Sequence, residues 1–358
     1  MNSFGKKLIL TTYGESHGVG IGGVLDGLPA GIRMDLDFIQ DEIDKRRART
    51  RFSTQRKESD TIEIYSGLFD GFTTGMPIGF FIKNSNTKSK DYDTIKELYR
   101  PSHADFTYDA KFGIRDYKGG GRSSARESVA RVGAGAMAQL LLNEFNIEIQ
   151  SGLFAIGSKT TAKFDFELAK NSEIFALGCE DEFKKEILDA KNSHDSVGGA
   201  VLTIVKNLPK GLGEVLYDKL DARIAAAVVG INGVKAVEIG AGANLSKERA
   251  SKANDQMDKN GFLSNNSGGI LGGISNGEEL VIKSYFKPTP SIFLPLKTVD
   301  KDGNEVIMKL KGRHDPCIAV RGSVVVTAMI RLLIADMMLL NLGSKLEHLH
   351  KIYSSDKN

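Results

Sequence analysis

The feature that most constrains the fold of this chain is a motif that occurs twice. Residues 28–31 read LPAG, and residues 208–211, 180 positions later, read LPKG. Each copy follows a strand-like pattern and precedes a helical one, which we expect to begin near Glu214 in the second copy. A second repeated motif comes later in the same order, as GLFDGFTTG at 67–75 and GILGGISNG at 269–277. These repeats predict two similar halves that share one core, because a solenoid needs at least three units.

Composition limits the class of protein and its partners. The 358 residues are 41% hydrophobic and 26% charged, which is ordinary globular composition and enough for one large core or two modest ones. The net charge is only +3, so any attraction for anions must come from local clusters of basic residues. The two cysteines, Cys179 and Cys317, are far apart and lack a CxxC motif. That spacing argues against a disulfide framework or a structural metal site and fits a reducing cytoplasm.

Neither end of the chain predicts a membrane segment. Residues 1–10, MNSFGKKLIL, hold too short an apolar run for a signal peptide. Residues 320–342 are apolar but include Arg321, Arg331 and Asp336, which are costly inside a bilayer. We therefore interpret this stretch as a strand followed by a helix that lies in the core or contacts another subunit.

Residues 118–137, KGGGRSSARESVARVGAGAM, predict a ligand-binding loop that leads into a helix. Its three consecutive glycines allow positive φ and a close approach of the backbone to a ligand. Ser124 and Glu127 have the spacing of a capping box, and apolar residues then recur every three or four positions. Arg122 and Arg126 flank the helix start, where backbone N–H groups and the helix dipole also favour an anion. The stretch suits a phosphate group; the alternative is an ordinary capped helix with solvated arginines.

The N-terminal glycine motif does not predict a dinucleotide site. Residues 8–13 predict a strand, and GESHGVGIGG follows it. Gly18, Gly20 and Gly23 match G-x-G-x-x-G, but the next residues predict a second strand and a turn. Because a pyrophosphate site needs a helix at that place, we discount the match. His17, beside Gly18, could serve either chemistry or structure.

A run of basic residues follows the first expected helix. Residues 35–47 predict a helix with one apolar face, acidic at its start and basic at its end. It continues into KRRARTRFSTQRK at 45–57, where seven of thirteen residues are Lys or Arg. This segment could bind nucleic acid, form a solvated surface or line a pocket for a multiply anionic substrate. A single aromatic residue, Phe52, and the small net charge argue against nucleic acid.

Several polar loops are candidate pocket walls. RPSHAD at 100–105 places His103 between an arginine and Asp105, and the carboxylate could raise the pKa of the imidazole and keep it protonated. The alternative is a histidine in a polar surface loop without a chemical role. Asp315, in the segment KGRHDPC, precedes a proline and is either a turn residue or a functional acid. Two more loops, INGV at 231–234 and KPTPS at 287–291, could line a pocket or be simple connecting turns.

Six segments carry a family resemblance. GESHGVGIGGVLDGLP at 14–29, GGGRSSARESVARVGAGAM at 119–137 and GRHDPCIAVRGSVVVTAM at 312–329 are the longest, and RPSHAD, SNNSGGILGGIS and KPTPSI also match. With these segments in register from about residue 5 to 340, the chain resembles the chorismate synthase family. The resemblance implies a lyase that eliminates phosphate and a ring hydrogen from 5-enolpyruvylshikimate 3-phosphate to give chorismate. It also implies a requirement for reduced FMN without net redox change.

The same resemblance implies an α+β fold, an internally duplicated β-α-β sandwich with helices packed between antiparallel sheets, assembled as a homotetramer. We expect one catalytic domain over residues 1–343, with halves at about 1–150 and 151–343, and a polar tail at 344–358. No separate reductase domain is evident, so the flavin would be reduced by NADPH at this site or by an external flavin reductase. A monofunctional cytoplasmic enzyme is the expectation.

The resemblance also assigns site residues. It implies catalytic roles for His17 as the acid that assists the leaving phosphate, His103 beside the flavin, and Asp315 as the group that helps flavin N5 accept a proton. The substrate and the flavin carry phosphate and carboxylate groups, which guanidinium forks bind well. The resemblance implies that the substrate or NADPH contacts Arg46, Arg51 and Arg126. Flavin contacts fall on Arg122, Ser123, Ser124, Asn232, Gly233, Gly272, Lys287, Pro288, Thr289, Pro290, Ser291 and Arg313.

Two other functions remain open from the residues. A flavin-dependent oxidoreductase would use a similar pocket, because a pocket for FMN does not dictate net electron transfer. Consumption of reduced flavin in step with product would indicate that function. A nucleic-acid-binding protein would use residues 45–57, and its affinity would fall steeply with salt.

Overall fold

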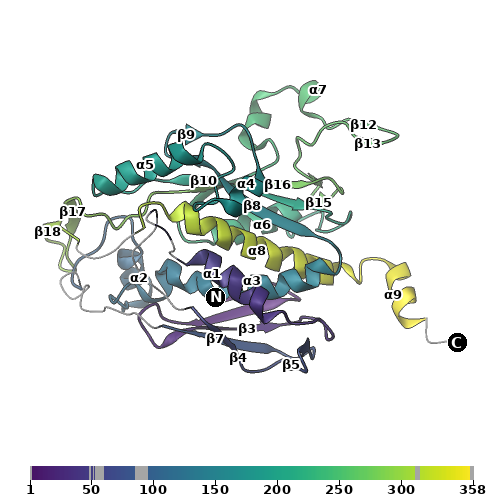
Figure 1. The fold of residues 1–358 in the computed structure, drawn as a ribbon, viewed down its shortest axis with the longest axis horizontal. Helices are drawn as coiled ribbons and strands as arrows, with labels where there is room; N and C mark the ends of the chain where they lie inside the picture. Colours follow the sequence, from purple (N-terminus) through teal and green to yellow (C-terminus); the bar gives the residue numbers. More distant parts are fainter. Residues whose placement is uncertain are drawn as a thin grey trace.

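Helices lie between two antiparallel sheets in the computed structural model of the chain (Figure 1). The structure describes residues 2–47, 50, 52, 60–84, 96–310 and 315–354. The first sheet has the order β1 (Ser3–Phe4), β2 (Ile9–Gly14), β3 (Gly20–Asp26), β7 (Ile78–Lys83), β4 (Ile62–Ile64). The second has the order β11 (Val234–Ile239), β16 (Leu280–Phe286), β10 (Gly199–Lys206), β8 (Glu148–Ile156), β9 (Lys159–Thr160). The expected α+β sandwich is therefore present.

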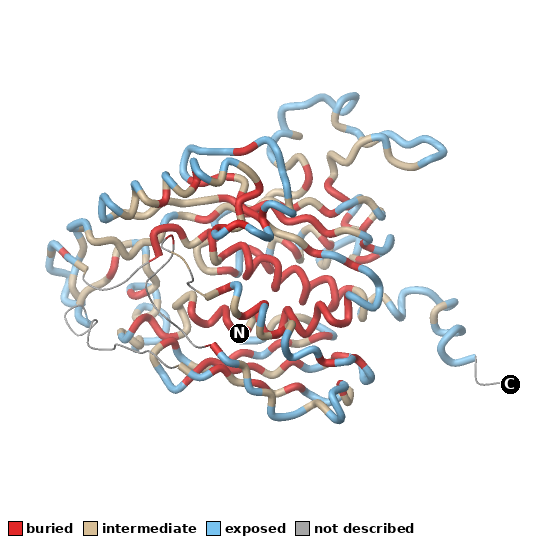
Figure 2. The backbone as a smooth tube through the Cα atoms, viewed as in Figure 1, coloured by how far each residue is buried: buried red, intermediate tan, exposed pale blue. Residues whose placement is uncertain are grey.

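The middle layer contains α1 (Leu36–Arg46), α3 (Ser128–Asn143), α6 (Leu220–Val229) and α8 (Ile318–Asn341). α3 packs against the first sheet, α8 packs against the second, and the two helices contact each other along their length. Figure 2 shows that both helices are buried along most of their length. By length and composition α8 could cross a membrane, but 83% of its most apolar stretch is buried inside the protein. It is the core helix of the sandwich.

The prediction of a strand before this core helix was wrong. Val324, Val325 and Val326 lie inside α8, which runs without a break from residue 318. β-Branched residues favour strands, but this preference is weak, and burial between two sheets overrides it. Asp336, which is fully buried in α8, accepts hydrogen bonds from the backbone N–H groups of residues 6–8. It thereby joins the beginning of the chain to the last core helix.

The two halves repeat one order of elements. In the first half β2, β3, α1, β4, the hairpin β5 (Leu68–Phe69) and β6 (Phe72–Thr73), β7 and α3 follow one another. In the second half β8, β10, α6, β11, the hairpin β14 (Ile270–Leu271) and β15 (Ile274–Ser275), β16 and α8 occur in the same succession. The sheet orders also correspond, because β2-β3-β7-β4 matches β8-β10-β16-β11. The repeated sequence motifs thus mark a repeated fold.

The LPxG turns have the same hydrogen bonds in both halves. The N–H of Gly31 donates to the carbonyl of Thr73 at 2.8 Å, and that of Gly211 donates to Ser275 at 2.9 Å. The Thr73 hydroxyl accepts from Ile32 N–H and donates to a proline carbonyl, and the Ser275 hydroxyl repeats both bonds. Both glycines have φ near +90°, which favours glycine. One difference from expectation is that the second helix, α6, begins at Leu220 rather than near residue 214.

Shorter elements decorate the sandwich: α2 (Asp105–Phe112), η2 (Gly121–Ser123), η3 (Ala125–Glu127), α4 (Phe166–Asn171), α5 (Glu180–Asn192), η4 (Gly242–Lys247), α7 (Ala250–Ala253), β12 (Met257–Asp258), β13 (Gly261–Phe262), β17 (Leu296–Val299), β18 (Glu305–Met308) and α9 (Leu346–Tyr353). The segment expected as a polar tail contains α9, which extends away from the body (Figure 1). Its apolar residues Leu346, Ile352 and Tyr353 are exposed.

Candidate active site

A cavity of about 460 Å³ lies where the two halves meet. From the first half it is lined by the loop before α2, the turn before α3, and the end of α1. From the second half it is lined by the α6–β11 connection, the loop after β16, and the start of α8. The lining residues are Arg46, Arg100, Ser102, His103, Ala104, Gly119, Ser123, Ser124, Ala125, Arg126, Val229, Ile231, Asn232, Gly233, Val234, Lys235, Lys287, Pro288, Thr289, Pro290, Ser291, Asp315, Ile318 and Arg321.

The glycine turn brings the two predicted histidines together. Gly119 and Gly120 have φ of 75° and 85°, values that side chains other than glycine rarely adopt. A Cβ on Gly119 would overlap the ring of His17, and one on Gly120 would lie 2.9 Å from the ring of His103. His17 itself is not among the lining residues of the cavity. Its Nδ1 lies 3.2 Å from the hydroxyl of Ser16. The glycines therefore give both imidazoles room beside the same turn.

The helix start differs from the predicted capping box. Ser124 does cap, but it accepts a hydrogen bond from Arg126 N–H at 3.4 Å and starts the single 3₁₀ turn η3, after which α3 begins. Glu127 does not reach back to Ser124; its carboxylate pairs with Arg131 one turn later, at 2.9 Å. Glu127 has the spacing of a capping box but pairs with Arg131 instead of with the backbone of Ser124. The backbone forms a 3₁₀ turn at the cavity wall.

His103 is held by a buried ion pair. Arg100 donates from Nε and Nη2 to the carboxylate of Asp105 at 2.7 and 2.8 Å, and His103 Nδ1 lies 3.1 Å from the same carboxylate. Burial opposes ionisation of Asp105, but these hydrogen bonds outweigh it and hold the pKa of Asp105 far below its ordinary value.

The expectation that Asp105 keeps His103 protonated was wrong in direction. Burial lowers the pKa of His103, because the charged imidazole loses solvation. The hydrogen bond with Asp105 opposes that effect, but the positive charges of Arg100 and Lys287 add to it. Since Asp105 already forms a two-point ion pair with Arg100, its charge supports the imidazolium only weakly.

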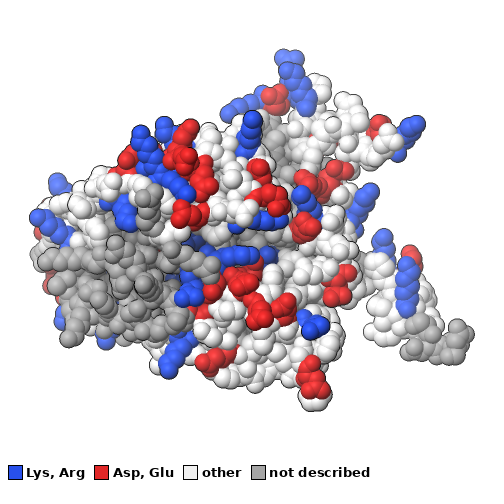
Figure 3. All heavy atoms as spheres, in the orientation of Figure 1, with Lys and Arg blue, Asp and Glu red and all other residues white. Residues whose placement is uncertain are grey.

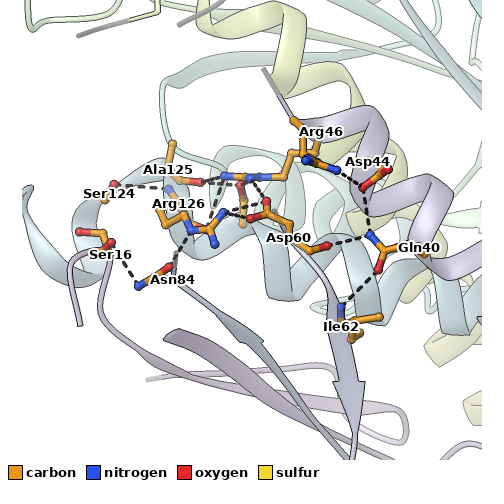
Figure 4. Close-up of polar contacts among 12 residues, drawn as sticks. Ser16, Gln40, Asp44, Arg46, Asp60, Ile62, Asn84, Ser124, Ala125 and Arg126 are labelled. Atoms are coloured by element: carbon orange, nitrogen blue, oxygen red, sulfur yellow. Dashed lines mark hydrogen bonds and ion pairs between the residues drawn. The ribbon is translucent and has the colours of Figure 1, made fainter. Parts of the chain in front are cut away.

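Two buried arginines share one carboxylate (Figure 4). Arg126 donates from Nη1 to both oxygens of Asp60 at 2.7 and 2.8 Å, and Arg46 Nη1 lies 3.4 Å from the same group. Arg46 also donates from Nε to the hydroxyl of Ser128 at 3.0 Å, and Arg126 donates from Nε to Asn84 at 3.0 Å. Arg46 is 2% exposed and Asp60 is 1% exposed. These guanidinium groups are fixed in place before any ligand arrives.

The second half contributes the opposite wall. The amide of Asn232 donates to the carbonyl of Ser123 at 2.9 Å, which joins the α6–β11 connection to the glycine turn. Lys287 donates to the carbonyl of Ser102 at 2.8 Å, and burial together with Lys235 lowers the pKa of its ammonium group. The hydroxyl of Thr289 is buried without a hydrogen-bond partner among the described residues.

Asp315 lies at the start of α8. Its Oδ2 accepts a hydrogen bond from Arg321 Nη2 at 2.6 Å, so the carboxylate, just before α8, is held at the cavity wall by a cation near the beginning of that helix. Asp315 is 8% exposed.

Besides His17, four of the predicted residues are not placed at this cavity. Arg122 donates to the hydroxyl of Thr12 on β2 at 2.6 Å and is not among the lining residues. Gly272 lies at the turn of the β14–β15 hairpin, where a Cβ would meet nothing within 4 Å. Arg51 and Arg313 lie outside the described residues. The cavity does hold His103, Asp315, Arg46, Arg126, Ser123, Ser124, Asn232, Gly233 and the loop 287–291.

Comparison with known proteins decides the family. A family model described as chorismate synthase matches residues 8–339. The chorismate synthase of Campylobacter fetus subsp. fetus is 63% identical, covering 99% of this chain and 100% of the relative. The enzymes of Campylobacter concisus and of Campylobacter jejuni strain RM1221 are 61% and 57% identical, each over 99% of this chain. This chain belongs to the chorismate synthase family.

A crystal structure of a chorismate synthase shares the fold. It aligns with a TM-score of 0.75 and 30% identity, covering 98% of this chain and 97% of the other. The chain is accordingly a lyase of this family, and its reaction is elimination of phosphate from 5-enolpyruvylshikimate 3-phosphate to give chorismate. The reaction needs a site for several negative charges, and the cavity gathers Arg46, Arg100, Arg126, Arg321, Lys235 and Lys287.

Several polar residues of this site were not predicted from the sequence. Asp60 lies in a stretch without a recognisable motif, and its link to the two arginines depends on segments that are far apart in the chain. Arg321 was considered only as a charge that disfavours a membrane span. No local spacing signals this pair, because Arg321 lies six residues after Asp315 and side chains pair along a helix at three or four residues.

Proposed function

We propose that the cavity between the halves is the active site of this elimination, and that it binds reduced FMN together with the substrate. The observation that carries this proposal is the convergence of both halves: residues of the glycine turn and of the 287–291 loop line one space. Its volume of about 460 Å³ falls in the range of roughly 300–1,000 Å³ usual for ligand pockets.

The chemistry of the wall fits a flavin. Ile231, Val234 and Ile318 offer apolar surface for a ring system, while Asn232 and Ser123 supply polar groups at its edge. These residues would hold a reduced flavin, which would lend electron density to the elimination and recover it as the ring hydrogen leaves, so that no net oxidation occurs.

The substrate anions would bind to the fixed guanidinium groups. Arg46 and Arg126 are buried and already oriented by Asp60, and their positive charges at the cavity wall would attract phosphate or carboxylate. Because the arginines are ordered before binding, little conformational entropy is lost when the substrate arrives. Arg51, by the family resemblance, would add a further contact.

The two histidines would divide the proton chemistry. His17, next to the glycine turn, would protonate the leaving phosphate, because a protonated phosphate leaves more readily. His103 has a lowered pKa in the free enzyme, and an anionic ligand beside it would raise that pKa and favour the imidazolium. Asp315, held by Arg321, would accept or relay a proton near the flavin.

The residues outside the cavity suggest how the assembly contributes. Gly272 lies on a hairpin with open space around it, so a flavin contact there fits a neighbouring subunit of a homotetramer. Arg122, which is bound to Thr12 on β2, would act from outside the cavity lining, and by the family resemblance Arg313 would contact the flavin. We also propose a single cytoplasmic catalytic unit spanning both halves, with flavin reduced by NADPH or by an external reductase.

An anaerobic assay tests the proposal. Purified protein, photoreduced FMN and 5-enolpyruvylshikimate 3-phosphate should release phosphate and form chorismate over many turnovers while the flavin stays reduced. Flavin oxidation in step with product would instead indicate an oxidoreductase. Replacement of His17 or His103 by Ala should lower turnover by roughly 10- to 10⁴-fold. The matched variant His350→Ala, on exposed helix α9, should keep the wild-type rate.

A further inference from the structure

Asn84 joins two parts of the proposed active site that are distant in the sequence. It follows β7 directly and lies 68 residues after Ser16 and 42 residues before Arg126. Figure 4 shows its side chain between the backbone at Ser16 and the guanidinium of Arg126. The segments that carry the family resemblance do not include Asn84, and the proposed function gives it no role.

The amide nitrogen of Asn84 holds the loop that carries His17. Its Nδ2 donates to the carbonyls of Gly18 at 2.9 Å and Glu15 at 3.0 Å, and it lies 3.3 Å from the carbonyl of Ser16. The loop is a tight turn, in which the N–H of Gly18 donates to the carbonyl of Glu15 at 3.0 Å. Because these carbonyls lie on both sides of His17 in the chain, the amide fixes the backbone from which the imidazole projects.

The amide oxygen of Asn84 holds Arg126. Its Oδ1 accepts a hydrogen bond from Arg126 Nε at 3.0 Å, while Nη1 of the same guanidinium donates to Asp60. Arg126 differs from the basic side chains at the surface. On the face shown in Figure 3, basic and acidic side chains lie next to one another, whereas Arg126 is 4% exposed and lines the cavity. Its guanidinium is therefore fixed from two sides, by a carboxylate and by Asn84.

These contacts allow one orientation of the Asn84 amide. A guanidinium can only donate hydrogen bonds, so it requires Oδ1, and backbone carbonyls can only accept them, so they require Nδ2. A carboxylate would offer acceptors to both neighbours, and a hydrocarbon side chain would offer neither group. The carboxamide therefore serves the arginine and the loop at the same time.

His17 depends on its surroundings for its position, because it is not among the residues that line the cavity. It lies beside Gly119, which does line it. The hydroxyl of Ser16, 3.2 Å from His17 Nδ1, belongs to the same loop that Asn84 holds. A general acid must come within hydrogen-bond reach of the oxygen that it protonates. An error of about 1 Å in such a position can cost on the order of 100-fold in rate.

We propose that Asn84 is a positioning residue that sets the place of His17 relative to Arg126. This inference rests on the proposed function, in which His17 protonates the leaving phosphate and Arg126 attracts an anionic group of the same substrate. Asn84 is not among the lining residues of the cavity, so it acts through these two side chains. A single amide thus keeps the acid and the cation in register.

NMR of labelled histidine rings tests the positioning directly. Asn84→Ala removes both contacts, and Asn84→Asp keeps an acceptor for Arg126 but loses the donor to the loop. Both variants should shift the ring signals of His17, assigned by their loss in His17→Ala, and leave those of His350 on α9 in place. The control Asn171→Ala, on α4, removes an exposed amide that donates to a backbone carbonyl at 3.1 Å and should shift neither. Unchanged His17 signals in both Asn84 variants would overturn the proposal.

Turnover measures what this position contributes to the reaction. Asn84→Ala should lower kcat about tenfold or more. The KM for the substrate should change less than kcat does, because Asp60 still holds Arg126. In the His17→Ala background, the same substitution should lower kcat by less than about twofold, because the group that Asn84 positions is already absent.

Multiplicative losses in the double variant, with a thermal midpoint near that of wild type, would indicate a general structural role and overturn the proposal. A wild-type rate in His17→Ala alone would instead remove the acid role from the proposed function. The ring signals of His17 would then still decide whether Asn84 positions it.

Discussion

Asp60 holds the two arginines at the centre of the proposed substrate site. Its carboxylate contacts both Arg46 and Arg126, and its carbonyl accepts a hydrogen bond from Gln40 at 2.7 Å (Figure 4). Loss of one partner of a buried ion pair is costly, because the remaining charges stay buried with less compensation.

We predict that Asp60→Asn lowers the free energy of unfolding by about 3 kcal/mol and weakens substrate binding. Urea denaturation measures the first effect and the KM for the phosphorylated substrate measures the second. Asp41→Asn, on the exposed face of α1, is the matched control and should change neither. Wild-type stability in Asp60→Asn would show that the arginines do not depend on this carboxylate.

His103 gives a pH-dependent prediction. Its folded-state pKa is lowered, mainly by burial, below the ordinary value of 6.5, so the unfolded chain binds the proton more readily. The neutral imidazole therefore contributes its full stability above about pH 6.5, and that contribution is lost as the pH falls below this value. NMR titration of the ring protons should give a midpoint below 6.5 for His103. A midpoint above 6.5 in the ligand-free protein would contradict the structure.

For single residues, the sequence alone identified many that line the cavity but not the residues that they contact. His103, Ser123, Asn232 and Asp315 stand in recognisable polar segments, so they could be selected from the sequence alone. The direction in which the pKa of His103 shifts could not be predicted from the sequence. It depends on the ion pair between Arg100 and Asp105 and on how deeply the loop is buried.

Among the elements, α3 and α8 position the site because both begin at the cavity and cross the whole core. They approach closely where Gly135 of α3 faces Ala328 of α8. A Cβ on Gly135 would lie 2.6 Å from the Cα, Cβ and carbonyl oxygen of Ala328. No real Cβ tolerates backbone atoms at that distance, so the helices would have to separate.

Gly135→Ala should therefore destabilise the protein by about 1–3 kcal/mol, although alanine is the better helix former. The overlap with backbone outweighs the gain in helix propensity, which is about 1 kcal/mol at most. Chemical denaturation is the direct measurement. The comparison variant is Gly343→Ala, where a Cβ meets nothing within 4 Å. Equal stability of the two variants would mean that the helix contact is looser than described.

Helices and strands were predicted correctly where neighbouring residues in the sequence determine the structure. The helix at 35–47 is α1, with Asp35 as N-cap accepting from Phe38 N–H at 2.9 Å. The strand at 8–13 is β2, shifted by one residue. The valines at 324–326 were misread because their conformation is set by the sheets on either side, and that environment is not visible in a short window of sequence.

The whole molecule is two copies of one unit around a shared core. A single cluster of buried apolar residues extends from Leu8, just before β2, to Met337 in α8 and includes both halves. We infer that neither half could bury its helices alone, because α3 and α8 cover each other. The repeated motifs predicted this duplication because each motif is a short contiguous segment whose two copies can be recognised in the sequence.

Equivalent substitutions in the two halves should have equal effects. Thr73→Val and Ser275→Ala each remove a buried hydroxyl that bridges the LPxG turn, and each should cost about 1–3 kcal/mol. Both should shift the same single unfolding transition, measured by circular dichroism and by tyrosine fluorescence. The control Ser246→Ala removes an exposed hydroxyl with one hydrogen bond and should have little effect. Two separate transitions would show that the halves unfold independently.

The measurement that bears most directly on the central claim is a crystal structure of the protein soaked with FMN and 5-enolpyruvylshikimate 3-phosphate. We predict the flavin ring between the glycine turn and the 287–291 loop, with Thr289 and Asn232 at its edge and the substrate anions on Arg46 and Arg126. Electron density for either ligand away from this cavity would contradict the account.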